Sequence, residues 1–578
     1  MTMAVERKDA ALGAAFLKSP LALLAAAFAA VAILLAMPLS APIGPMYWDV
    51  YVYYDGANRI FDGQVPSIDF FAPVGALSYY LFAGALALFP NGQATLLAHW
   101  SLLAVTAPLM ALVVWQVDVK SRATAYALLI PFLIFALLPF NGREFYPFPS
   151  SDGFGIYNRQ VCQVLYVLMA ALMFVRGQLL LALIVTASVT ALFFLKITGF
   201  VAALMLCAFA FAAGRLAFRY AVASALAFAA ILAGIELASG LVSSYIGDIL
   251  ALVATNSETL LPRLVQSVSI NFGVVASSLA LCLVLLFADR KRLGAQATDI
   301  LRRPRPAAVV TFLDNNAFWL GAAIIAGVFF EAQNTGSQAM IFIWPVLWSI
   351  FSRIPAMMAT PKLMMATAAL AAAAYLPMTI NTVERASRTY IGAINTVPLA
   401  HDNLKSLGNV TTREPVLKRA ELMLAVHPKH PGVLDEIALN KELPAPLLYS
   451  DLDFQITHLM TIDRAIGSIR ALEAAKGIEF ETIMMLSFAN PVPWLMDRSA
   501  PLHIAIGADP FRAVPEPDAE VLAAVREVDL ALYPKCPATW ANMRLLQIYG
   551  EALKDHRKIE LDACFSAYVH PRLAGKLD

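Results

Sequence analysis

Long apolar stretches separated by short polar segments fill the first two thirds of the chain. A helix needs about 20 mostly apolar residues to cross a bilayer. Such stretches occur at eleven places, and we predict a membrane-spanning helix at each: roughly 20–39, 94–116, 123–140, 158–175, 178–195, 198–213, 220–240, 270–288, 309–330, 336–352 and 362–380. We expect the first to be a true span, because its apolar run is too long for a cleavable signal peptide and no small-residue cleavage site follows it.

One further apolar run, 72–89, is long enough to span, and the distribution of basic residues decides against it. If it does not span, 16 basic residues share one side with the N-terminus, including six between Arg290 and Arg305, whereas Arg59, Arg143, Arg159 and Arg263 face the other side. Basic loops mark the cytoplasmic side of a membrane protein. We therefore predict eleven spans, a half-inserted 72–89 segment, a cytoplasmic N-terminus and an extracytoplasmic segment after residue 380.

Composition agrees with a membrane protein and excludes several other classes. Of the 578 residues, 60% are hydrophobic and only 14% are charged, against about 25% charged in an average soluble domain. Disordered, collagenous and disulfide-scaffold classes are therefore excluded. The net charge of +1 supplies no field that would attract nucleic acid.

The charge is concentrated in residues 381–578, which hold 21 of the 42 Lys and Arg and 25 of the 41 Asp and Glu. We predict a transmembrane module over 1–380 and an extracytoplasmic soluble α/β domain over 381–578. Residues 383–440 read as helices and connections without a clear strand. Beyond them, helices and strands alternate, which favours a partly parallel sheet: helices at 457–475, 516–527 and 538–555, and strands at 482–488, 502–507, 528–533 and 557–569. No dinucleotide fingerprint, P-loop or nucleophile elbow occurs.

The five cysteines divide in the same way as the charges. Cys162, Cys207 and Cys282 lie in apolar runs and are typical small core residues. Cys536 and Cys564 lie in the extracytoplasmic segment, where the environment is oxidising in bacteria and a bridge between them can form. No cysteine spacing typical of a metal site is found.

The first outer loop, residues 41–75, is the most informative segment. Apolar residues recur at helical spacing from 50 to 61, with Asp55 and Arg59 on the other face, and Gly63 and Pro66 follow as helix stops. This pattern predicts an amphipathic helix lying in the membrane interface. Asp49 stands just before it, beside Trp48. Its carboxylate can simply cap the helix, or it can act as a general base on a sugar hydroxyl or bind a metal.

The string Trp48-Asp49, followed by a tyrosine-rich helix and GQVPSIDFFAPVG, resembles the first periplasmic loop of GT-C superfamily glycosyltransferases. It is most similar to the bacterial branch related to protein mannosyltransferases and to the lipid A aminoarabinose transferase. In that family an Asp, often Asp-Glu, follows the first span, and a G-x-x-P-Y-x-D-F pattern follows about fourteen residues later. Here Gly63, Pro66 and Asp69 match that pattern, whereas Ser67 replaces the Tyr and Val50 replaces the Glu. The resemblance covers roughly residues 20–200 and implies a GT-C-like fold.

The second outer loop, residues 141–159, contains prolines, serines and glycines and is therefore predicted to be a structured connection. Ser-Asp-Gly is also an ordinary turn sequence, so Asp152 has a purely structural interpretation. The resemblance implies instead that Asp152 joins Asp49 at the active site. Arg143, Tyr157 and Arg159 are further candidates for substrate binding.

Lys196 interrupts the apolar stretch 178–213. An ionisable residue at membrane depth is a functional candidate by default, although a lysine at the end of a span can also extend its amine to the interface. The family often has Thr-Lys-Gly at this point, which makes Lys196 a candidate ligand for a lipid phosphate.

Together these features predict an inverting, polyprenyl-phosphate-sugar-dependent glycosyltransferase of the bacterial inner membrane. Asp49, Asp152 and Asp69 are the catalytic candidates, and Lys196, Arg159, Arg143, Trp48, Asp55 and Tyr157 are the substrate-binding candidates. The acceptor is a glycan, lipid or protein. If a divalent metal takes part, Asp49 and Asp152 are its candidate ligands. The alternatives are a flippase of lipid-linked glycans, which would place charged residues midway through several spans, and a non-catalytic membrane scaffold.

Overall fold

The computed structural model describes residues 19–144, 150–256, 260–332, 336–354, 360–430, 440 and 451–578. Its predicted apolar stretches fold as helices: α2 (Pro20–Ala36), α4 (Ala76–Leu88), α5 (Ala94–Trp100), α6 (Leu103–Asp118), α7 (Arg122–Leu137), α8 (Ile156–Phe174), α9 (Gln178–Leu195), α10 (Ile197–Ala212), α11 (Phe218–Ser239), α14 (Phe272–Ala288), α17 (Asn316–Glu331), α18 (Trp344–Phe351) and α20 (Pro361–Gly392). Two further helices, α12 (Leu241–Asn256) and α13 (Leu260–Ile270), lie outside the predicted stretches.

The helices differ widely in whether they can cross a membrane by themselves. Within the described residues, three are long and apolar enough, namely α9, α11 and α20 with its continuation to Asn395, and up to six spans result if each sharply bent helix pair counts as one. The segment 336–352, predicted to span, instead forms a short 3-10 helix, η2 (Ile341–Ile343), and α18. This segment packs inside the bundle, where Val346, Leu347 and Ile350 are buried. Because other helices surround it, it does not have to be long enough to cross the membrane. The count of eleven spans stays a prediction.

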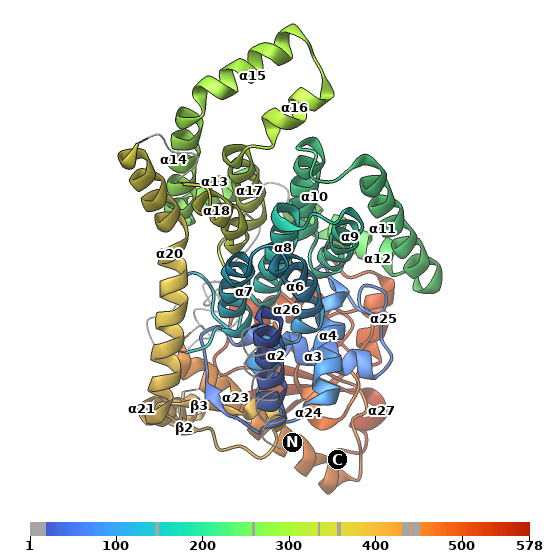
Figure 1. Ribbon diagram of the computed structural model, residues 1–578. Coiled ribbons are helices and arrows are strands. Elements are labelled where there is room, and N and C mark those ends of the chain that lie inside the picture. The colour runs from blue at the N-terminus through green and yellow to red at the C-terminus, as the bar shows by residue number, and fades with distance from the viewer. Residues whose placement is uncertain are drawn as a thin grey trace, which may run out of the picture.

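The loops between the helices gather at two opposite ends of the molecule. At one end, Arg215 pairs with Asp314 at 2.8 Å, and Gln116 accepts a hydrogen bond from the backbone of Arg176. The basic helix α15 (Arg290–Arg302) and the apolar helix α16 (Pro306–Leu313) project from this end, whereas the C-terminal elements lie at the opposite end (Figure 1). The large basic loop is thus far from the C-terminal segment.

Helix α4, which covers most of the 72–89 run, has both of its ends at the same end of the bundle. Gly75, just before it, packs against the backbone of Phe194 and Leu195 at the end of α9. Gly92, just after it, packs against the carbonyl of Leu35 at the end of α2. This is the arrangement expected of a segment that does not cross.

Helix α3 (Trp48–Phe61) forms where the pattern predicts, but it does not lie exposed at a membrane surface. Its residues from Asp49 to Arg59 are all buried. The C-terminal segment covers it: Asn58 donates to the carbonyl of Arg498, and the ring of Trp494 lies 4.2 Å from that of Tyr54. The expected water-facing side of this helix is therefore an internal contact.

The C-terminal segment contains a four-stranded mixed sheet in the order β4-β5-β7-β6. Strands β4 (Ile483–Met485) and β5 (Leu530–Pro534) are parallel, and β7 (Phe565–Val569) is antiparallel to both β5 and β6 (Arg557–Glu560). The remaining helices of the segment are α21 (Glu414–Val426), α23 (Leu452–Lys476), α24 (Val492–Met496), α25 (Ala519–Arg526), α26 (Trp540–Tyr549) and α27 (Pro571–Ala574).

Three details of this segment differ from the predictions. Residues 502–507 form no strand but only an isolated bridge between Ala505 and Phe71, because the first outer loop occupies that edge. The predicted strand 557–569 is a hairpin of two strands. Residues 383–440 do contain strands, β2 (Val397–Pro398) and β3 (Val410–Thr412), and β3 pairs with β1 (Ala41–Pro42) of the first outer loop.

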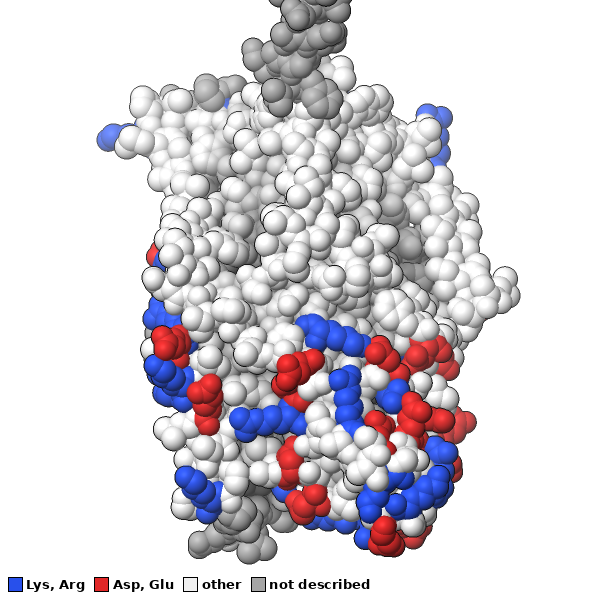
Figure 2. All heavy atoms as spheres, turned by 90° about the horizontal axis from the view of Figure 1, so that it is seen from below, with Lys and Arg blue, Asp and Glu red and all other residues white. Residues whose placement is uncertain are grey.

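The face seen in Figure 2 divides into an almost uncharged part and a part where acidic and basic side chains are mixed. Cys536 and Cys564 form a disulfide bond, as an oxidising environment allows. Helix α20 runs continuously through the predicted domain boundary at residue 380 and ends at Gly392, so it links the apolar body to the charged segment.

Candidate functional site

The first and second outer loops meet at one end of the bundle. The Ser151 hydroxyl donates to the carbonyl of Pro42 at 3.2 Å, and the backbone N–H of Gly155 donates to Oδ2 of Asp49 at 2.7 Å. The chain segments that carry Asp49 and Asp152 are therefore in direct contact, although about a hundred residues separate them in sequence.

Asp49 lies in the first turn of α3 and against the first turn of α8, and it is 7% exposed. Burial raises its pKa to about 6, although the N–H groups of Gly155 and Ile156 and the charges of Arg159 and Lys196 oppose this shift. Helix N-termini favour negative charge. The site thus holds a carboxylate that is fixed in place and titrates near neutrality, as a general base requires.

The close contact with α8 depends on Gly155. This residue has a φ of 68°, a region that L side chains rarely adopt, and a Cβ atom here would lie 2.8 Å from the carbonyl oxygen of Gly336. Glycine therefore lets the chain turn into α8 with its N–H directed at Asp49.

Lys196 lies at the break between α9 and α10, where its extended backbone ends one helix and begins the next. Its Nζ donates to Oδ1 of Asn158 at 2.9 Å and lies 4.9 Å from the centre of the Tyr157 ring. Both partners belong to the first turn of α8, the turn that also contacts Asp49. The structure thus brings together three of the predicted site residues, namely Asp49, Tyr157 and Lys196.

Arg159 is fully buried and bound on all sides by protein. Its guanidinium donates to the side chain of Asn141 and to the carbonyls of Phe154 and Asp152, and its Nε contacts Nδ1 of His99. A guanidinium has five N–H donors, and most of those of Arg159 face protein acceptors. We therefore assign Arg159 to holding the second outer loop in shape, while its charge still acts on Asp49.

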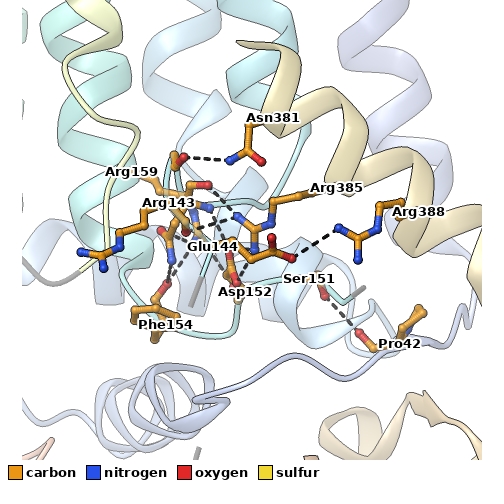
Figure 3. Close-up of polar contacts among 12 residues, drawn as sticks. Pro42, Arg143, Glu144, Ser151, Asp152, Phe154, Arg159, Asn381, Arg385 and Arg388 are labelled. Atoms are coloured by element: carbon orange, nitrogen blue, oxygen red, sulfur yellow. Dashed lines mark hydrogen bonds and ion pairs between the residues drawn. The ribbon is translucent and has the colours of Figure 1, made fainter. Parts of the chain in front are cut away.

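Asp152 faces α20, where both of its oxygens accept from Nη2 of Arg385 at 2.9 Å (Figure 3). Its Oδ2 also accepts the backbone N–H of Asn141 at 2.7 Å. The side chains of the pair are 0% and 5% exposed. These contacts make Asp152 an anchor of the loop.

A divalent metal between Asp49 and Asp152 does not fit this arrangement, because Arg385 and Asn141 occupy the Asp152 carboxylate. Among the residues that the structure describes, no three His, Cys, Asp or Glu side chains gather in a way that could hold a metal ion.

The other predicted site residues lie apart from Asp49 or make contacts of their own. Asp55 forms a buried ion pair with Arg59 at 3.0 Å. Asp69 accepts the N–H of Val65 within its own turn. The Arg143 side chain is exposed and points away from the Asp152–Arg385 pair (Figure 3). The Trp48 ring packs 5.8 Å from that of Phe488 in the C-terminal segment.

Sequence reasoning missed four residues that shape the site. Asn158 binds Lys196, and Glu331, which accepts from Ser337, acts on Lys196 through its charge. Arg512 of the C-terminal segment acts similarly on Tyr157. Arg385 lies beyond the predicted end of the last span. The helical pattern continues past residue 380, and this continuation could have placed Arg385 on the same helix.

No protein-family model and no curated protein sequence matches this chain. Among solved structures, it is similar to ArnT from Cupriavidus metallidurans in the apo state, with 12% identity and a TM-score of 0.39 over 94% of this chain and 97% of that one. It is also similar to the archaeal oligosaccharyltransferase AglB from Archaeoglobus fulgidus in complex with an inhibitory peptide and a dolichol-phosphate, with 12% identity and a TM-score of 0.31 over 96% of this chain and 74% of that one. Both are GT-C superfamily members, the superfamily that the first outer loop resembles.

Proposed function

We propose that this protein is an inverting glycosyltransferase that moves a sugar from a polyprenyl-phosphate donor to an acceptor on the extracytoplasmic face of a bacterial inner membrane. The observation that carries the proposal is the buried Asp49 carboxylate, which is fixed by the first turn of α8 and lies next to Lys196. The reaction needs a base for the acceptor hydroxyl and a cation for the donor phosphate. Asp49 and Lys196 provide these two groups at the outer end of the membrane helices.

Asp49 is the proposed base of a single displacement. The acceptor hydroxyl gives its proton to the carboxylate while its oxygen forms a bond to the anomeric carbon. The bond from that carbon to the phosphate oxygen breaks, and the lipid phosphate leaves with the electron pair. One displacement inverts the anomeric configuration, and it needs only one carboxylate at the reacting atoms.

Lys196 is the proposed ligand of the donor phosphate. Its position at a break between two apolar helices puts a positive charge where a lipid headgroup would lie. Lysine binds phosphate as a point charge. Tyr157 and Asn158 hold the amine in this position through the ring contact and the hydrogen bond.

The disulfide between Cys536 and Cys564 supports the proposed sidedness. Disulfides persist in oxidising compartments such as the periplasm. The C-terminal segment carries this bond and covers α3, so the site faces the same compartment. The basic loop at the opposite end of the molecule agrees with a cytoplasmic position there.

Replacing Lys196 by glutamine is expected to raise the KM for the lipid-phosphate donor about 10- to 100-fold, because a charge-assisted hydrogen bond is worth about 1.5–3 kcal/mol. The measurement is release of lipid phosphate from a panel of polyprenyl-phosphate sugars by the protein in proteoliposomes. Lys120→Gln, an exposed lysine at the other end of the molecule, is the matched control. An unchanged KM for Lys196→Gln would remove Lys196 from the donor site.

The rate should fall as the solution becomes acidic. The pKa of Asp49 is raised to about 6 by burial, and only the ionised carboxylate can accept a proton. Above that pH the base is active, and below it kcat/KM should fall about tenfold for each pH unit. A profile of kcat/KM between pH 4.5 and 8 checks this. A rate that is flat down to pH 4.5 would show that Asp49 is not the base.

A further inference from the structure

A cavity of about 200 Å³ lies where α20 meets β1, β3, α21 and the start of α23. It is separate from the surroundings of Asp49 described above. Its polar lining is dominated by the threonines Thr389, Thr396, Thr411 and Thr412. One buried water needs only about 10–15 Å³ of a cavity measured in this way, so the cavity has room for a small ring.

Thr389 is the most telling residue of the lining. It is 1% exposed, and its Oγ1 has no hydrogen-bond partner among the residues that the structure describes. A threonine in a helix ordinarily bonds the carbonyl four residues earlier. A buried hydroxyl without a partner is unfavourable, and a ligand hydroxyl in the cavity would supply the missing hydrogen bond.

Other groups of the lining also suit a hydroxylated ligand. The Thr396 hydroxyl donates its one proton to the carbonyl of Ala393 at 2.7 Å and accepts from the Thr411 hydroxyl at 2.9 Å, so the Thr411 oxygen can still accept a hydrogen bond from a ligand. Arg419 and Asp453 form an ion pair at 3.0 Å and add donors and acceptors. Apolar atoms of Pro42, Ile43, Pro415, Val416 and Leu452 complete the walls. A sugar ring has polar hydroxyls around its edge and apolar C–H groups on its faces, so it fits a cavity whose walls are partly polar and partly apolar.

The cavity is linked to the proposed active site through two structural elements. Pro42, in its wall, precedes Asp49 in the first outer loop, and its carbonyl accepts from Ser151 (Figure 3). Thr389 lies one helical turn beyond Arg385, the partner of Asp152. The cavity wall thus shares the first outer loop with Asp49 and shares α20 with the Asp152–Arg385 pair.

We propose that this cavity binds one sugar unit of a glycan acceptor, some units away from the one whose hydroxyl reacts. That the bound glycan is the acceptor rests on the proposed function. That the cavity binds a sugar is independent of the proposed function. A hexose or N-acetylhexosamine is the chemical class, because the lining offers threonine hydroxyls, the Arg419–Asp453 ion pair and the guanidinium of Arg413 as hydrogen-bonding groups. Such a site would hold an extended acceptor in register with Asp49.

Saturation-transfer NMR on the full-length protein in nanodiscs tests binding directly, with the methyl glycosides of glucose, galactose, mannose and N-acetylglucosamine as probes. At least one probe is expected to bind, and Thr389→Val should raise its Kd about tenfold. Thr379→Val is the matched control, because Thr379 lies on the same helix and its hydroxyl bonds the carbonyl of Tyr375. Arg419→Gln, at an exposed position, is a second variant expected to weaken binding.

The results separate this inference from the proposed function. Binding that is lost in Thr389→Val but kept in Asp49→Asn supports the sugar site whether or not Asp49 proves catalytic. No binding by any of the four probes overturns it, and so does binding that neither Thr389→Val nor Arg419→Gln weakens. Either result leaves the donor assay, and hence the transferase proposal, unaffected.

Discussion

Replacing Asp49 by asparagine is expected to lower sugar transfer about a thousandfold, within the range that general-base catalysis contributes. The amide cannot accept the proton of the acceptor hydroxyl. Its carbonyl oxygen can still accept the N–H of Gly155, which Asp49 binds at 2.7 Å, so α3 and α8 should keep their contact. The variant should therefore be folded and inactive, and transfer of radiolabelled sugar to acceptor measures the loss.

The control for this variant is Asp62→Asn. Asp62 follows the same helix but is exposed at its far end, and its replacement should leave the rate unchanged. A folded Asp49→Asn protein with full transfer activity would contradict the proposed function. It would also favour the alternatives, a flippase or a scaffold, in which no base is needed.

Replacing Asp152 by alanine is expected to cost about 3–5 kcal/mol of stability, because it leaves the buried guanidinium of Arg385 without its counter-ion. The two side chains are 0% and 5% exposed, so water cannot take the place of the carboxylate. The Asn141 N–H would lose its acceptor as well. Thermal unfolding in detergent should show a clearly lower midpoint than for the unmodified protein.

Two further variants sharpen this prediction. Glu414→Gln removes an exposed ion pair with Lys418, whose side chains are 63% and 70% exposed, and should cost at most about 1 kcal/mol. Asp152→Leu combined with Arg385→Leu removes both charges and should recover much of the stability lost in Asp152→Ala. An Asp152→Ala protein as stable as the unmodified one would show that the pair does not anchor the second outer loop.

The hydrophobic pattern was sufficient to locate most of the helices. Stretches such as 178–195 and 220–240 match α9 and α11 closely, because an apolar run of that length is stable in a bilayer only as a helix. That the 72–89 segment does not cross stays a prediction from the positions of the basic residues, and the contacts at both ends of α4 agree with it. The alternation in the C-terminal segment predicted a partly parallel sheet, which β4 and β5 confirm.

The candidate site was only partly predictable. The sequence singled out Asp49 because it precedes an amphipathic helix beside Trp48 in a loop that resembles the GT-C family, and Lys196 because it interrupts an apolar run. It could not show that Asp152 turns to Arg385, which lies 233 residues further along the chain. Nor could it show that Arg159 binds its own loop, because every residue has a backbone carbonyl and the residue types therefore do not reveal which carbonyls accept a hydrogen bond.

By itself, the sequence determined which segments are apolar and which are helical, because these properties depend on local composition. Only the tertiary structure decided what each polar face meets. Asp55 and Arg59 lie on the polar side of α3, yet the C-terminal segment covers them and they pair with each other in the interior. The physical reason is that periodicity defines a face of a helix, whereas the partner that covers that face comes from distant parts of the chain.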